Sequence, residues 1–69
     1  AQEFSTESAK AIKLYKDGRR NFTLMYYDIA EKDLLKAIAI DDQFIEAYML
    51  LGDVYKSSGK KDIAISMYQ

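Results

Sequence analysis

Apolar residues recur every three to four positions through most of this chain, which is the spacing that one face of an α-helix requires. Residues 1–4 show no such period and are expected to be disordered. Ser5 and Thr6 carry hydroxyls that can cap free backbone amides, so the first helix is expected to begin there. Its apolar side includes Ala11, Gly18 and Phe22. The pattern therefore opens on an amphipathic helix.

Three further helices are predicted by the same spacing. A turn is expected at 20–23, with Thr23 as the N-cap of a second helix over 24–40. Asp41 and Asp42 are expected to end that helix and to cap a third over 44–56. Gly59 would close the third helix, and a fourth would run on to Gln69. The chain contains no proline to interrupt these helices, and the fold class is all-α.

The two halves of the chain are related by a shift of 34 residues. This shift superposes Gly18 on Gly52 and Asp28-Ile29-Ala30 on Asp62-Ile63-Ala64. Met25 falls on the turn glycine Gly59, so the first copy is the less regular one. A fixed period of this length is typical of helical repeat proteins.

Six residues of the second copy carry a family signature: Tyr48, Leu51, Gly52, Tyr55, Ala64 and Tyr68. Their spacing resembles the tetratricopeptide repeat (TPR), with Tyr48 in place of the usual tryptophan and Tyr68 in place of the usual phenylalanine. The resemblance implies a TPR-like α-α superhelix fragment of two stacked antiparallel hairpins. These hairpins would be 5–40, with Gly18, Ala30 and Ala37 at repeat positions, and 41–69, which is truncated at its C-terminal end.

The same resemblance implies a function. TPR proteins bind an extended peptide or a helix on a concave face formed by the first helix of each repeat. Carried over to this sequence, that face would contain Ile12, Tyr15, Arg19, Phe22, Glu46, Met49, Asp53 and Lys56. We therefore expect a non-catalytic protein interaction or assembly module of a larger TPR-containing protein.

A second hypothesis is self-association. Each repeat buries its apolar face against the next, so the incomplete second repeat is expected to leave an exposed face. That face would include Leu50, Val54, Ile63 and Met67, and pairing with another copy of the chain would give a homo-oligomer.

Charge supplies the third and weakest hypothesis. The net charge is −1, but the stretch 10–20 contains five basic residues, namely Lys10, Lys13, Lys16, Arg19 and Arg20. Such a face could hold phosphates or nucleic acid. Tyr15 is its only embedded aromatic residue, so it lacks a platform on which bases could stack. We expect a solvated face and no nucleic-acid partner.

Other classes of function fit the sequence poorly. The chain contains no cysteine and no histidine, which removes the usual nucleophile pairs and zinc ligands. Asp41, Asp42 and Glu46 lack the alternation and the central glycine of a calcium loop. We expect no enzyme activity, no metal and no cofactor. The apolar runs are too short to span a bilayer, so membrane insertion is not expected.

The compartment stays open at this level. The chain begins at Ala1 without an initiator methionine, which fits a cleaved leader, a removed tag or an excised piece. The absence of cysteine and a resemblance to N-terminal repeats of some bacterial envelope proteins lean toward an exported, bacterial periplasmic origin.

Overall fold

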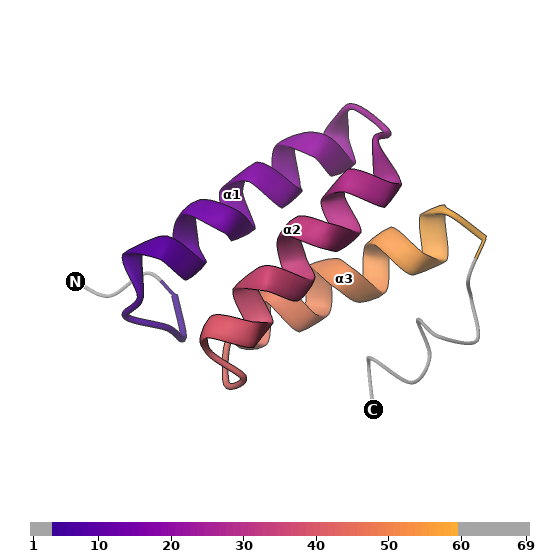
Figure 1. The fold of residues 1–69 in the computed structure, drawn as a ribbon. Helices are drawn as coiled ribbons and strands as arrows, with labels where there is room; N and C mark the ends of the chain where they lie inside the picture. Colours follow the sequence, from indigo (N-terminus) through magenta and orange to yellow (C-terminus); the bar gives the residue numbers. More distant parts are fainter. Residues whose placement is uncertain (1–3, 60–69) are drawn as a thin grey trace.

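The structure is a computed structural model that describes residues 4–59, and this part of the chain forms helices and no strand (Figure 1). Three helices are present there: α1 (Ala9–Thr23), α2 (Tyr27–Ile40) and α3 (Ile45–Ser57). The all-α prediction is confirmed. The expected fourth helix, with Ala64 and Tyr68, lies outside the described residues.

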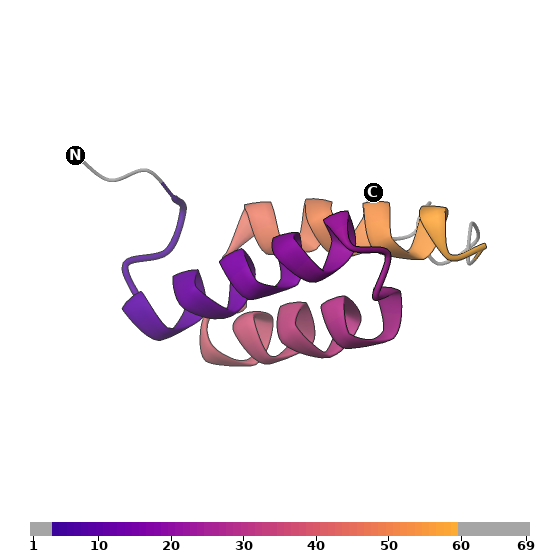
Figure 2. The same cartoon turned by 90° about the horizontal axis from the view of Figure 1, so that it is seen from above.

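The helices are arranged as two successive antiparallel pairs. α2 runs back alongside α1, and α3 reverses again to run alongside α2 (Figures 1 and 2). α1 and α3 point in the same direction and touch only slightly. The middle helix α2 therefore supplies most of the contacts that hold the other two in place.

Small residues allow the helices to pack closely. Ala11 on α1, Ala30 and Ala37 on α2 and Ala47 on α3 are all fully buried. A Cβ atom added at Gly18 would lie 3.0 Å from Cγ of Leu34, so this glycine lets α1 approach α2. The remaining buried apolar residues are Leu34, Phe44, Leu50, Leu51, Val54 and Tyr55.

The residues that the repeat pattern marked as structural lie mostly inside. The buried ones are Gly18, Ala30, Ala37, Leu51, Gly52 and Tyr55, while Tyr48 is half-buried. Tyr55 also joins two helices, because its hydroxyl on α3 donates to Oε2 of Glu31 on α2 at 2.8 Å. Burial and this hydrogen bond raise the pKa of Tyr55 to about 12, with burial the larger cause.

The predicted turn at 20–23 is wrong by about one helical turn. α1 continues through Thr23, whose hydroxyl donates to the Arg19 carbonyl at 3.0 Å and caps nothing downstream. The chain reverses instead at 24–26, where the Met25 amide donates to the Phe22 carbonyl and the Tyr26 amide to the Asn21 carbonyl. This pair of bonds is the Schellman arrangement, which needs a left-handed residue. Met25 supplies it with φ of 65°.

The end of α3 repeats this turn 34 residues later. The Leu24 amide donates to the Arg20 carbonyl at 3.0 Å, and the Ser58 amide donates to the Val54 carbonyl at 2.9 Å. Each turn then continues with a left-handed residue, which is Met25 in the first and Gly59, with φ of 90°, in the second. The 34-residue relation seen in the sequence is therefore present in the backbone as well.

The N-terminal segment differs from expectation. α1 begins at Ala9, where Ser8 and not Ser5 is the N-cap: its Oγ accepts from the Ala11 amide at 3.1 Å. Ser5 caps a different helix, since its Oγ accepts from the amide of Ile45 at the start of α3 at 2.8 Å.

Phe4 and Asp41 correct two further expectations. Phe4 was assigned to a disordered end, yet its ring lies 5.4 Å from the Tyr15 ring and 6.0 Å from the Phe44 ring, measured between centroids. Asp41 does not cap α3. Its Oδ1 accepts from the Gln43 amide at 3.0 Å, and a hydrogen bond from Thr6 lowers the pKa of its carboxyl.

Candidate functional site

A shallow hollow of about 250 Å³ lies between α1 and α3. Tyr15 is the lining residue from α1, and Glu46, Met49, Leu50 and Asp53 line it from α3. The α3 residues are spaced at i, i+3, i+4 and i+7, which places them along one face of the helix. The hollow thus combines an aromatic ring, two apolar side chains and two carboxylates.

Four of the eight residues expected on the concave face line this hollow, namely Tyr15, Glu46, Met49 and Asp53. Arg19 lies beside it, because its guanidinium carbon is 5.6 Å from the centre of the Tyr15 ring. This distance suits a cation–π contact.

The other three expected residues lie elsewhere. Ile12 and Phe22 pack against the core, and the Phe22 ring is 5.8 Å from the ring of Tyr27. Lys56 is exposed but does not line the hollow. The sequence reasoning missed Leu50 as a lining residue, although its i+4 spacing from Glu46 indicated the same face of the helix.

The N-terminal segment holds two of the lining residues. The Ser5 amide donates to both carboxylate oxygens of Glu46 at 3.2 Å, and the Ser5 hydroxyl donates to Oε1 at 2.5 Å. The hydroxyl is the main cause that lowers the pKa of Glu46, so this carboxyl stays negatively charged at neutral pH. Phe4 meanwhile packs on Tyr15. The chain before α1 therefore positions groups on both sides of the hollow.

The predicted exposed face of the second repeat is wrong where the structure describes it. Leu50 is 9% exposed and Val54 is 1% exposed, so neither offers a large apolar surface to another copy. The prediction assumed that these side chains needed a third repeat, whereas both belong to the buried core of the structure. Ile63 and Met67 lie outside the described residues.

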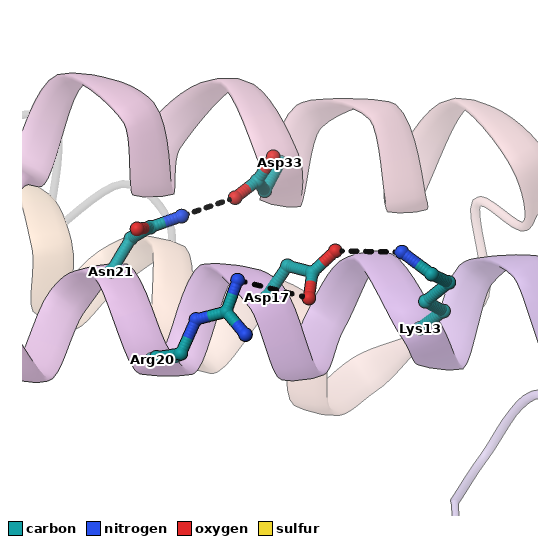
Figure 3. Close-up of polar contacts among 5 residues, drawn as sticks. All are labelled: Lys13, Asp17, Arg20, Asn21 and Asp33. Carbon is teal, nitrogen blue, oxygen red and sulfur yellow. Dashed lines mark hydrogen bonds and ion pairs between the residues drawn. The ribbon is translucent and has the colours of Figure 1, made fainter.

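The basic stretch of α1 is partly neutralised by an acid on the same helix. Asp17 accepts from Lys13 Nζ at 3.2 Å and lies 3.5 Å from Nη2 of Arg20 (Figure 3). Beside them, the side-chain amide of Asn21 donates to Oδ2 of Asp33 on α2 at 2.8 Å, and this hydrogen bond joins α1 to α2. The exposed pairs stabilise the fold little, but they reduce the positive charge that a phosphate would meet.

A second hollow lies at the turn between α1 and α2. It has a volume of about 330 Å³ and is lined by Met25, Tyr26, Tyr27, Asp28 and Ile29. Met25 is 73% exposed and Leu24, beside it, 54% exposed. The turn thus exposes large apolar side chains, and Asp28 is the only charged residue among those that line the hollow.

Residues 4–59 contain no group of three or more acidic, cysteine or histidine side chains that could hold a metal ion. Over the same residues, no helix has the length and apolar character needed to cross a bilayer.

Comparison with known proteins adds no assignment: no protein-family model, no curated protein and no solved structure matches this chain.

Proposed function

We propose that the chain is a TPR-type helical repeat module that binds a peptide segment of a partner protein in the hollow between α1 and α3. The activity is binding without catalysis. The observation that carries the proposal is the hollow itself, because four of its five lining residues are ones that the repeat resemblance assigns to the ligand face: Tyr15, Glu46, Met49 and Asp53.

The repeated turn supports the repeat part of the proposal. The two left-handed residues, Met25 and Gly59, are 34 residues apart, which is the length of a TPR. Gly18 also makes the close helix contact that a small residue at its repeat position would serve. α1 and α3 would then be the first helices of two successive repeats, and the ligand face of such arrays is formed by these first helices.

The chemistry of the hollow supports the binding part. Met49 is 57% exposed although it is apolar, and it stands beside an aromatic ring. Methionine and aromatic side chains are enriched where proteins bind one another, since methionine is flexible and polarisable and an aromatic ring buries a large apolar area. The hollow is also shallow, which suits a side chain or two of a peptide better than an enclosed small molecule.

A peptide selection tests this proposal. The whole 69-residue chain is immobilised and a random peptide display library is enriched on it, after which the recovered peptides are titrated in solution. Met49→Ala should weaken the recovered peptides about fivefold, because it removes one well-placed apolar contact worth about 1 kcal/mol.

Met25→Ala is the matched control, since Met25 is also an exposed methionine but lies at the other hollow. It should leave the affinity unchanged. Recovery of no peptide at all would refute the binding function. Peptides that bind Met49→Ala as tightly as the natural chain would refute the site.

A further inference from the structure

The second hollow, at the turn between α1 and α2, is lined by groups that attract a cation. Two tyrosines, a methionine, an isoleucine and one carboxylate form its lining, namely Met25, Tyr26, Tyr27, Asp28 and Ile29. A cation is attracted to the face of an aromatic ring and to a carboxylate. Among the described residues, no basic side chain lines this hollow. Its composition therefore favours a positively charged ligand.

The cations of the chain itself lie outside the hollow. Nη2 of Arg20, on the last turn of α1, is 3.5 Å from Asp17. Lys32 follows Asp28 by one turn of α2, and the structure of residues 4–59 places no ion pair between them. The positive end of the α2 dipole also lies at this turn, but the negative end of the α1 dipole meets it there. Asp28 therefore sets the sign of the charge at the hollow.

The backbone of Met25 points to the same place. Met25 holds a left-handed φ of 65°, where the equivalent turn residue at the end of α3 is Gly59. Its side chain is 73% exposed, so it regains little packing energy for this strain. Strained residues of this kind cluster at ligand sites. A contact between the Met25 side chain and a ligand accounts for a methionine at this position.

The lining also selects among cations. A lysine ammonium carries three N–H donors and a strong hydration shell, and an arginine guanidinium carries five donors. Asp28 is the only charged acceptor among the lining residues, so it cannot satisfy them. A quaternary ammonium has no N–H group, and its methyl groups suit an apolar and aromatic surface. The volume of about 330 Å³ is at the lower end for ligand sites and suits one head group.

We propose that the hollow at the turn between α1 and α2 binds a small quaternary ammonium group of the choline type. The positive charge lies beside Asp28 and the tyrosine rings, and the methyl groups contact Met25. The Tyr27 ring is supported by Phe22, at 5.8 Å between ring centroids. Free choline and the head group of a choline lipid share this chemistry. The site is separate from the hollow between α1 and α3, so it does not depend on the proposed peptide binding.

A nuclear magnetic resonance titration of the whole chain, labelled in its methionine methyl groups, tests this proposal. Choline should shift the Met25 signal saturably and leave the Met49 signal in place, because Met49 lies at the other hollow. The Met25 signal is the one that Met25→Ala removes. The neutral analogue of choline, in which carbon replaces the nitrogen, has the same shape and should bind much more weakly. Sodium chloride at equal concentration controls for ionic strength.

Variants locate the contacts. Tyr26→Leu should weaken choline about twofold to fivefold, which is the range of an exposed cation–π contact, whereas Tyr26→Phe keeps the ring and should keep the affinity. Asp28→Asn should weaken choline by a similar factor. Asp42→Asn is the matched control, because Asp42 is an exposed acid beyond the other end of α2 (Figure 1). Circular dichroism checks that each variant keeps the natural helix content.

Sedimentation with vesicles separates the two sources of the ligand. Binding to phosphatidylcholine vesicles but not to phosphatidylglycerol vesicles would support a lipid head group, and binding of free choline alone would support a soluble ligand. A Met25 signal that choline does not shift saturably would overturn the proposal. Equal binding of the neutral analogue would also overturn it, as would unchanged affinity in both Tyr26→Leu and Asp28→Asn. Each of these failures leaves the peptide-binding proposal standing.

Discussion

Position 25 offers a direct test of the repeated turn. Met25 has φ of 65° at the end of α1, where the equivalent residue at the end of α3 is Gly59. An L-residue in this conformation brings its Cβ atom too close to the following carbonyl oxygen. Replacing Met25 by alanine and by glycine separates this strain from the loss of the side chain, because both variants remove the methionine and only glycine removes the Cβ atom.

The expected magnitude follows from two opposing terms. The left-handed conformation costs an L-residue about 1–2 kcal/mol. Glycine loses more chain entropy on folding, which costs about 0.5–1 kcal/mol relative to alanine. Met25→Gly should therefore be more stable than Met25→Ala by about 0.75 kcal/mol. For a chain of this size that difference corresponds to about 3–6 °C in melting temperature.

The assay is thermal and urea unfolding of both variants, followed by circular dichroism at the helix band. Leu35 is the matched control, because it is also an exposed apolar residue but lies inside α2, where the backbone is helical. There the order should reverse, with Leu35→Ala more stable than Leu35→Gly by about 1 kcal/mol, since glycine gains nothing from a left-handed backbone at this position. If Met25→Ala is as stable as Met25→Gly, position 25 is not left-handed in solution and the equivalence with Gly59 fails.

Two further predictions concern hydrogen bonds between distant parts of the chain. Ser5→Ala should destabilise the fold by about 1 kcal/mol in urea unfolding, because the start of α3 loses its cap. Ser5 also lowers the folded-state pKa of Glu46, so the contact between them stabilises the fold in a pH-dependent way. Its contribution to the free energy of unfolding should be fully present above pH 4.5, the ordinary pKa, and should be lost as the pH falls through the lowered value. Tyr55→Phe should cost about 1 kcal/mol, because a hydrogen bond between α3 and α2 is lost. The pKa of Tyr55 is raised from 10.0 to about 12, so its contribution is present below pH 10.0 and is lost as the pH rises to about 12; the natural chain should lose stability over this range and the phenylalanine variant should not.

Each of these has a control on the same kind of residue. Ser57→Ala changes an exposed serine at the end of α3 and should shift stability by less than about 0.5 kcal/mol. Tyr26→Phe does the same for an exposed tyrosine. A Ser5→Ala chain as stable as the natural one would show that Ser5 does not cap α3. Identical alkaline unfolding of the natural chain and Tyr55→Phe would contradict the raised pKa.

The sequence predicted the helices well because their faces are set by local spacing. Ala30, Leu34 and Ala37 recur at helical intervals along α2, and all three are buried. The ends of the helices were predicted less well. Asn21 was taken for a turn residue from its type, yet it lies inside α1 and its side chain reaches Asp33, twelve residues away. A residue type gives a preference for a turn, and a tertiary contact of this kind overrides it.

The candidate site was predicted in part for the same reason. Glu46, Met49 and Asp53 share one face of α3, so any reading that places α3 correctly finds them together. The contacts of Ser5 with Glu46 and Ile45 span 41 and 40 residues, and no local pattern encodes them. A serine near the start of a helix looks the same in sequence whether it caps that helix or another one.

This N-terminal contact links the stability of the fold to the shape of the hollow. Ser5 caps α3 and also holds the carboxylate of Glu46, while Phe4 packs on Tyr15, so one short segment fixes side chains on both sides of the hollow. A ligand that meets fixed partners loses less conformational entropy on binding than one that must order them. Loss of the Ser5 hydroxyl would leave Glu46 held by the Ser5 backbone amide alone, and it would also remove the hydroxyl bond that competes with a ligand for that carboxylate. The two effects on affinity oppose each other, whereas their effects on the stability of α3 do not, so stability is the cleaner measure of what Ser5 does.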